Sequence, residues 1–194
     1  MNYKKIEKQV LQMLKEGLNP NLYYHGVHHT LEVIENVELI AQKENISKEN
    51  IQLLKLAALM HDIGFVSEYV GHEEAGCQIS RDYLPQFKIS EEAIDQICGM
   101  IMATKIPQNP KNQLESILAD ADLLYLGTDS FMNIGNTLFE ELKANHKIKS
   151  EKEWNQIQAN FLSNHTYHTD YCINKFTAKK TENFKLVTDW LSKN

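Results

Sequence analysis

The sequence predicts an all-α protein. Apolar residues recur three and four positions apart along several stretches, which is the period of an amphipathic helix, and the alternating pattern of a strand is almost absent. Serine precedes several of these stretches as a helix N-cap would, and glycine or proline follows their ends. With 194 residues, 42% of them hydrophobic, and no linker-like tract, the chain is expected to form a single compact domain over residues 1–194.

The predicted helices follow one another with readable ends. Caps and breakers give these bounds: Tyr3 to about Lys15, a helix containing His25, Ser47 as N-cap to His61, His72 to Leu84, and Ser90 as N-cap to about Ala103. A loop at Pro107 and Pro110 precedes a helix that contains Asp122. Ser150 and Glu153 predict a capping box at the start of a late helix.

The charge and cysteine content of the chain argue against several classes of protein. The net charge is −6 and the chain has one arginine, Arg81, so neither a basic groove for duplex nucleic acid nor a polybasic membrane patch is expected. The cysteines are scattered without a C-x-x-C pair, which argues against a zinc ribbon or a disulfide framework. No segment has the length and apolarity of a membrane span, and the N-terminal residues lack the apolar core of a signal peptide. We expect a cytoplasmic protein.

Histidine and aspartate residues fall on the inward faces of three predicted helices. His29 shares a helix face with Val33, Val37 and Ile40, and His61 shares one with Ile51, Leu54 and Ala58. Asp122 lies at the edge of the apolar face formed by Leu114, Leu118, Ala121 and Tyr125. Burying such groups is costly without compensation, and imidazole with carboxylate is a ligand set for a divalent metal. Facing helices build metal sites in this way. The sequence therefore predicts a metal site in the helical core, with ligands His29, His61, Asp62 and Asp122.

These residues carry a resemblance to a known family. The order His29, His61-Asp62, Asp122 resembles the H…HD…D signature of the HD-domain superfamily of metal-dependent phosphohydrolases. The stretches around each ligand, within residues 24–126, are similar to those of the superfamily. The resemblance implies the all-α HD fold and hydrolysis of a phosphate ester. Members of the superfamily include nucleotidases, cyclic-nucleotide phosphodiesterases, guanosine tetraphosphate hydrolases and di-iron oxygenases.

The expected function is metal-dependent hydrolysis of a phosphomonoester or phosphodiester bond in a small metabolite, with a nucleotide preferred. The shortage of arginine argues against tight capture of a polyphosphate. One divalent ion is expected to activate water, and Mn, Fe, Mg, Co, Ni and Zn are not distinguished by the sequence. Two alternatives stay open: a di-metal oxygenase of the same fold, and a non-catalytic metal- or ligand-binding module.

Four residues are assigned catalytic roles. Asp62, besides binding the metal, would hold the attacking water. His25 would contact the phosphate or protonate the leaving oxygen, as the histidine of a similar Tyr-His-Asn motif does in the phosphodiesterase branch, although Gly26 replaces that asparagine here. His72 would contact the substrate or bind a second metal, with a satisfied core histidine as the third reading. Lys105 would offset phosphate charge.

Other polar residues near these motifs receive structural roles. Asp120 points roughly 130° from the centre of the inward stripe, so Asp122 is preferred as the fourth ligand. His28 is assigned to a supporting position rather than to the metal. His165 and His168 continue the stripe of the late helix and are expected to pack in the core.

Overall fold

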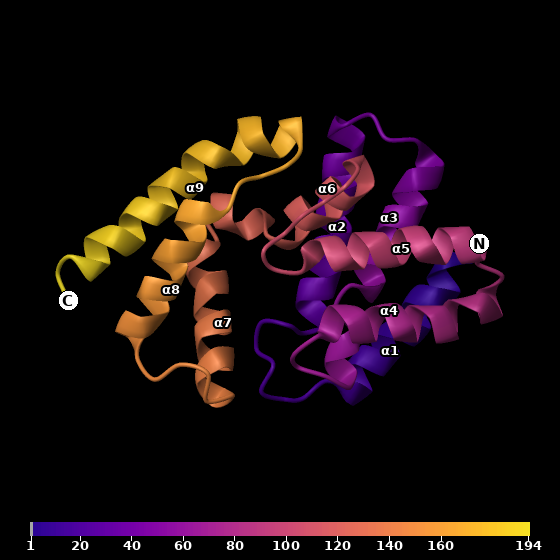
Figure 1. Cartoon of the computed structure of the whole chain (residues 1–194), viewed down its shortest axis with the longest axis horizontal. Helices are drawn as coiled ribbons and strands as arrows, with labels where there is room; N and C mark the ends of the chain where they lie inside the picture. The colour runs from indigo at the N-terminus through magenta and orange to yellow at the C-terminus, as the bar shows by residue number, and fades with distance from the viewer. Residues whose placement is uncertain (1) are drawn as a thin grey trace. The chain divides into compact units, whose positions relative to one another are not determined.

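The computed structural model describes residues 2–194, and over this range the chain is helical with no β-strand (Figure 1). The α-helices are α1 (Tyr3–Gly17), α2 (Val27–Lys43), α3 (Lys48–Met60), α4 (His72–Tyr83), α5 (Glu91–Thr104), α6 (Gln113–Asp122), α7 (Phe131–Ala144), α8 (Glu151–Asn164) and α9 (Asp170–Leu191). Short 3-10 turns are η1 (Ile63–Val66), η2 (Leu84–Phe87) and η3 (Leu124–Gly127). The predicted all-α class is confirmed. None of the helices described is both long enough and apolar enough to cross a membrane.

Internal contacts divide the chain into two compact units. Unit 1 contains residues 2–19 and 25–122, and unit 2 contains residues 20–24 and 123–194. Helices α1 to α6 belong to unit 1, which also holds every predicted metal ligand, and α7 to α9 belong to unit 2. The single-domain organisation over residues 1–194 stays a prediction.

Helix α3 forms the centre of unit 1. It packs against α1, α2, α5 and α6, and its second half is buried on every side, as its nearly continuous apolar sequence requires. The predicted inward stripe of α2 is also buried, with Val33, Val37 and Ile40 inaccessible to solvent. Because α2 and α3 are fixed by these contacts, the polar residues that share their stripes are held in the interior.

The Leu54→Ala substitution tests this packing. Leu54 is 0% exposed on α3, and removing its side-chain atoms leaves a cavity, so we expect the free energy of unfolding to fall by about 2–5 kcal/mol. Leu31→Ala is the matched control, because Leu31 is 41% exposed on α2 and its truncation should change stability by roughly 0.5 kcal/mol or less. Urea unfolding followed by circular dichroism measures both. Equal losses in the two variants would contradict the assigned core.

Local capping chemistry sets several helix starts. The hydroxyls of Ser47, Ser90 and Ser150 accept hydrogen bonds from backbone N–H groups three residues ahead, at 3.2, 3.3 and 3.2 Å, as predicted. The capping box at α8 is only half formed, because the Glu153 carboxylate accepts from the N–H of Lys149, at 2.8 Å. It therefore binds the donor one residue before the N-cap.

Two predicted helix extents are wrong. The second helix begins at Val27 with Gly26 as N-cap, so His25 precedes the helix instead of lying within it; the Gly26 carbonyl accepts the first helical hydrogen bonds. Helix α8 ends at Asn164, so the stripe does not continue to His165 and His168. Near this end the Asn164 side chain donates to the Asn160 carbonyl at 2.7 Å, and such local side-chain bonds compete with the helix.

Unit 2 has its own apolar core between α7, α8, α9 and η3. Residues buried in this core include Leu126, Phe131, Leu162 and Val187. The Asn183 side chain on α9 donates to the backbone carbonyls of Leu126 and Thr128 at 2.9 and 3.0 Å. These bonds satisfy carbonyls at the end of η3 and fix α9 against it.

Candidate metal centre

Helix ends in unit 1 bring the predicted ligands together. His29 lies in the first turn of α2, and His61 is the C-cap of α3. Asp62 follows as the first residue of the turn into η1, and Asp122 is the last residue of α6. Since short side chains at helix ends can converge without backbone between them, three buried helices supply one cluster.

The side-chain heads lie within ligand distance of one another. His29 Nε2 is 3.0 Å from Asp122 Oδ1 and 3.4 Å from His61 Nε2, and His61 Nε2 is 3.7 Å from Asp122 Oδ1. Two atoms that each lie about 2.1 Å from one ion are about 3.0 Å apart at a right angle and about 3.4 Å apart at the tetrahedral angle. The spacing of these three atoms therefore fits a shared divalent ion.

The ligand atoms of His29, His61 and Asp122 all lie within 4.8 Å of one another, and Asp62 adds an oxygen beside the two histidines. Its Oδ2 lies 3.2 Å from His61 Nε2 and 3.7 Å from His29 Nε2. This oxygen is buried, and within residues 2–194 it accepts no hydrogen bond. A buried carboxylate oxygen without a donor is costly unless a cation compensates it. The donor set of two imidazole nitrogens and two carboxylate oxygens is suited to a divalent transition metal.

A backbone contact fixes the orientation of His61. Its Nδ1 lies 2.7 Å from the carbonyl oxygen of Ala58, which is one of the last α3 carbonyls and has no partner within the helix. A carbonyl can only accept, so Nδ1 carries the proton and donates to it. Nε2 is then the nitrogen that faces the cluster, where an ion would replace its proton; this is the arrangement typical of a metal-ligating histidine.

The electrostatics of the cluster favour a bound cation. Burial lowers the pKa of His61, but the carboxylates of Asp62 and Asp122 outweigh this effect and raise the pKa to about 9. Burial also raises the pKa of Asp62, yet the neighbouring imidazoles, His61 above all, hold it well below its usual range. The carboxylate thus stays ionised in the interior and attracts positive charge to the side of the cluster where the two histidine nitrogens lie.

An aromatic stack lies on the other side of Asp62. The ring of Phe65, in η1, stacks on His72 with centroids 3.9 Å apart and lies 4.3 Å from the ring of His25. His72 Nε2 is 3.7 Å from Asp62 Oδ1 and 3.6 Å from Glu73 Oε1. Burial lowers the pKa of His72. The structure therefore places His72 beside Asp62, with His25 and His72 both in contact with the Phe65 ring.

Three contributors to the site were not predicted from the sequence. Phe65 and Glu73 lie next to motifs that were identified, but helical periodicity marks neither of them as part of a site. The Ala58 carbonyl is a backbone group, and a search for metal-binding side chains does not detect it. This contact could have been predicted in general terms, because the last carbonyls of a helix need hydrogen-bond donors and His61 follows α3 directly.

Other predicted residues lie outside the cluster. The ammonium group of Lys105, the C-cap of α5, pairs with the Glu74 carboxylate on α4, and both side chains are about half exposed. Asp120 is fully buried on α6, while it is Asp122 whose carboxylate reaches His29. His28 is exposed on α2. His165 belongs to unit 2, where its ring packs against Phe161 and Tyr167.

Metal removal should lower the thermal stability of the chain. An ion that binds the folded state at a hundred times its dissociation constant adds about 2.7 kcal/mol, or roughly 5–10 °C in Tm for a chain of this size. We expect this shift when Mn²⁺ is added to chelator-treated protein in differential scanning fluorimetry. His61→Ala should abolish the shift. An equal rise in Tm in the wild type and in His61→Ala would show that the ion binds at a site without His61.

The comparisons with known proteins agree with this geometry. The family model described as HD domain matches residues 26–126. The chain is also similar in structure to a predicted HD superfamily hydrolase from an uncultured Thermotogales bacterium. The TM-score is 0.61 at 20% sequence identity, over 96% of this chain and 89% of that one. No curated protein matches the sequence significantly.

Proposed function

The chain belongs to the HD-domain family, and we propose that it is a metal-dependent phosphohydrolase acting on a small phosphorylated metabolite, with a nucleotide as the preferred class. The observation that carries this proposal is the buried Asp62 Oδ2, which accepts no hydrogen bond from residues 2–194 and lies beside two histidine nitrogens. His29, His61, Asp62 and Asp122 would hold one divalent ion. Such an ion, when bound, lowers the pKa of water and polarises a phosphoryl oxygen.

The remaining groups supply orientation and proton transfer. Asp62 turns Oδ2 to the ligand cluster and Oδ1 toward His72, 3.7 Å away, so one carboxylate can bind the ion and orient the attacking water. We assign to His72 a contact with the substrate, which it makes as a neutral imidazole because burial lowers its pKa. His25, whose ring centroid lies 6.1 Å from that of His72, would protonate the leaving oxygen. Lys105 would reach a phosphate only by leaving Glu74.

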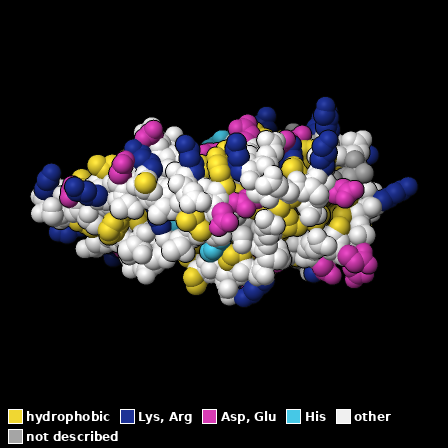
Figure 2. Space-filling model, turned by 90° about the horizontal axis from the view of Figure 1, so that it is seen from above, with side chains coloured by type: hydrophobic (Ala, Val, Ile, Leu, Met, Phe, Trp, Pro, Cys, Tyr) yellow, Lys and Arg dark blue, Asp and Glu magenta, His cyan; other side chains and the backbone are white. Residues whose placement is uncertain are grey.

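The charge distribution supports a compact phosphate ester as substrate. Arg81, the single arginine of the chain, pairs with Asp95 at 2.6 Å and is therefore engaged away from the predicted ligands. On the face shown in Figure 2, basic and acidic side chains are interspersed, and no broad basic area is visible there. Binding of a polyphosphate normally uses several guanidinium groups, so a monoester or a small diester fits better.

A metal-dependent substrate screen tests the proposal. The chelator-treated chain, reloaded with Mn²⁺, Fe²⁺, Co²⁺, Ni²⁺, Zn²⁺ or Mg²⁺, is assayed against p-nitrophenyl phosphate, its bis ester, nucleoside monophosphates and cyclic nucleotides. We expect turnover of at least one class that is lost on chelation. If the chain binds an ion yet hydrolyses nothing in the panel, the non-catalytic metal- or ligand-binding module replaces the phosphohydrolase.

One observation favours the di-metal alternative enough to test it. His72 Nε2 lies 3.7 Å from Asp62 Oδ1 and 3.6 Å from Glu73 Oε1. These three residues are therefore candidate ligands for a second ion. We expect one ion per chain, because His29, His61 and Asp122 lie within metal-binding distance of one another and Asp62 Oδ2 lies beside both histidines. His72→Ala should then keep that ion and lower kcat by roughly 100-fold through the lost substrate contact. Two ions in the wild type, falling to one in the variant, would instead support the di-metal oxygenase.

A further inference from the structure

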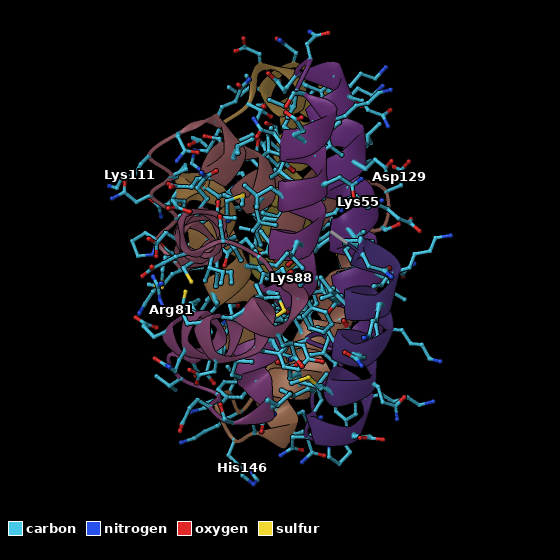
Figure 3. All side chains as sticks on the ribbon, turned by 90° about the vertical axis from the view of Figure 1, so that its right-hand side faces the viewer. Lys55, Arg81, Lys88, Lys111, Asp129 and His146 are labelled. Atoms are coloured by element: carbon cyan, nitrogen blue, oxygen red, sulfur yellow. The ribbon has the colours of Figure 1, made fainter. Side chains whose placement is uncertain are left out.

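Helices α4 and α5 pack closely against each other in unit 1 (Figure 1), and their contact includes ion pairs and two cysteines as well as apolar side chains. Near one end, Lys105 pairs with Glu74; near the other, Arg81 pairs with Asp95 at 2.6 Å. Figure 3 shows Arg81 at the outer edge of the molecule in that view. Between the two ion pairs lie Cys77 on α4 and Cys98 on α5, far apart in sequence but facing each other across the helix pair.

The two thiols approach each other reciprocally. Cys77 Sγ lies 3.5 Å from the backbone oxygen of Cys98, and Cys98 Sγ lies 3.7 Å from the backbone oxygen of Cys77. Each sulfur therefore sits against the backbone of the other residue, and the ion pairs on both sides hold the helices in this register. This placement puts the two thiols side by side across the helix pair, and a disulfide needs such proximity.

The chemical environment makes the pair asymmetric. Interaction with the Cys77 thiol, and after it the guanidinium of Arg81, lowers the pKa of the Cys98 thiol to about 7, whereas interaction with Cys98 and burial raise the pKa of the Cys77 thiol. Cys98 is thus the thiolate-forming partner and Cys77 the resolving thiol. Cys77 is partly exposed and opens the pair to small solutes, while Cys98 is 5% exposed.

We propose that Cys77 and Cys98 form a redox modification site, at which hydrogen peroxide converts the two thiols into an intrachain disulfide between α4 and α5. The Cys98 thiolate attacks one peroxide oxygen, which breaks the O–O bond, releases hydroxide and leaves a sulfenic acid on Cys98. The Cys77 sulfur then attacks the Cys98 sulfur and expels hydroxide, which takes the Cys77 proton to give water. In sum, two thiols and one peroxide give one disulfide and two waters. This site is separate from the proposed metal centre and does not depend on it.

Thiol counting on the full chain tests the proposal. The chain is treated with hydrogen peroxide, denatured, and alkylated with N-ethylmaleimide, and the added maleimides are counted by intact mass. The reduced chain should take three, one for each of Cys77, Cys98 and Cys172. The oxidised chain should take one, and dithiothreitol should restore three. Peptide mapping should show a single linked pair, containing Cys77 and Cys98.

Cys172 provides the matched control, because it is fully buried on α9 in unit 2. Cys172→Ala should still close the disulfide and take no maleimide after oxidation, whereas Cys77→Ala should keep its Cys172 thiol and form no linked pair. If a variant fails to fold, the number of maleimides added to the wild-type chain before and after oxidation tests the proposal on its own. Three maleimides after a peroxide dose that consumes free glutathione would overturn the proposal, as would chain dimers or oxygen adducts in place of the linked pair.

The closed bond should also be visible in thermal melting. A disulfide across residues 77–98 restricts the unfolded chain, and a loop of this length predicts a rise in Tm of roughly 5–10 °C over the reduced protein. The comparison uses Cys77→Ala, treated in the same way, which should not shift. A lower Tm in the oxidised wild type would show that the helices must move to form the bond, which contradicts the geometry on which the proposal rests.

Discussion

Asp62→Ala is expected to reduce turnover by roughly 1000-fold or more, equivalent to about 4 kcal/mol of transition-state stabilisation, while the chain stays folded. The substitution removes an ion ligand and the group that orients water. The substitution removes the attraction between Asp62 and His61, but it also removes a buried carboxylate that is costly and whose Oδ2 accepts no hydrogen bond from the described residues, so the fold should survive. Loss of activity with retained structure is the result expected of a functional rather than a structural residue.

Steady-state kinetics on the best substrate of the panel, with circular dichroism for the fold, measures this effect. Asp82→Ala is the matched control, since Asp82 is an exposed aspartate on α4. It should retain the wild-type kcat/KM. Activity of Asp62→Ala within a few fold of the wild type would remove Asp62 from the mechanism, and an unfolded variant would assign it a structural role.

Gly64→Ala is expected to lower the free energy of unfolding by at least about 3 kcal/mol or to prevent folding. A Cβ at position 64 would lie 1.9 Å from the backbone oxygen of His72 and 2.8 Å from the backbone nitrogen of Gly76. These are backbone atoms at the start of α4, and they cannot rotate away as a side chain can. The close approach of η1 to α4 is also what places His72 beside Asp62, so metal-dependent activity should be lost with stability.

Gly76→Ala is the control for this prediction, because it adds a Cβ on the opposite side of the same contact. That Cβ would meet the backbone oxygen of Met60 at 3.5 Å and the nitrogen of Gly64 at 3.6 Å, which is ordinary van der Waals contact. Alanine also favours the helix over glycine by about 0.5–1 kcal/mol. Urea unfolding should therefore separate the two variants by more than about 2 kcal/mol. Similar stabilities would show that η1 and α4 can move apart freely.

Much of unit 1 was predictable because its determinants are local. The inward stripe of α2 and the serine caps at Ser47 and Ser90 depend on residues within one or two turns, and the structure has them where the sequence predicts. The order of the motif residues also predicted the family, which the family model over residues 26–126 confirms. The assignment of Asp122 in preference to Asp120 followed from helical phase, and the structure brings Asp122 to His29.

The errors concern helix ends that helical periodicity does not locate, and the omission of Phe65 concerns tertiary packing. His25 was placed inside a helix because its spacing from His29 suits one turn, but the Gly26 carbonyl begins α2 instead. The late helix was predicted to continue through His165, but α8 ends at Asn164, where the Asn164 side chain donates a hydrogen bond to the Asn160 carbonyl. The Phe65 stack depends on the approach of η1 to α4, a contact between segments that periodicity does not report.

The cysteine pair shows the same limit. Cys77 and Cys98 are separated by twenty residues and carry no spacing motif, so in the sequence they appear scattered. Only the packing of α4 on α5 brings their sulfurs together. Both thiols are free in the structure, and the proposed bond is a modification of that state.

Anomalous diffraction from crystals grown with Mn²⁺ tests the central claim most directly, because it locates the ion rather than its effects. We predict one anomalous peak about 2.0–2.3 Å from His29 Nε2, His61 Nε2, Asp62 Oδ2 and Asp122 Oδ1 together. A peak bound to other side chains, or no peak among these four heads at saturating Mn²⁺, would contradict the assignment of the metal centre.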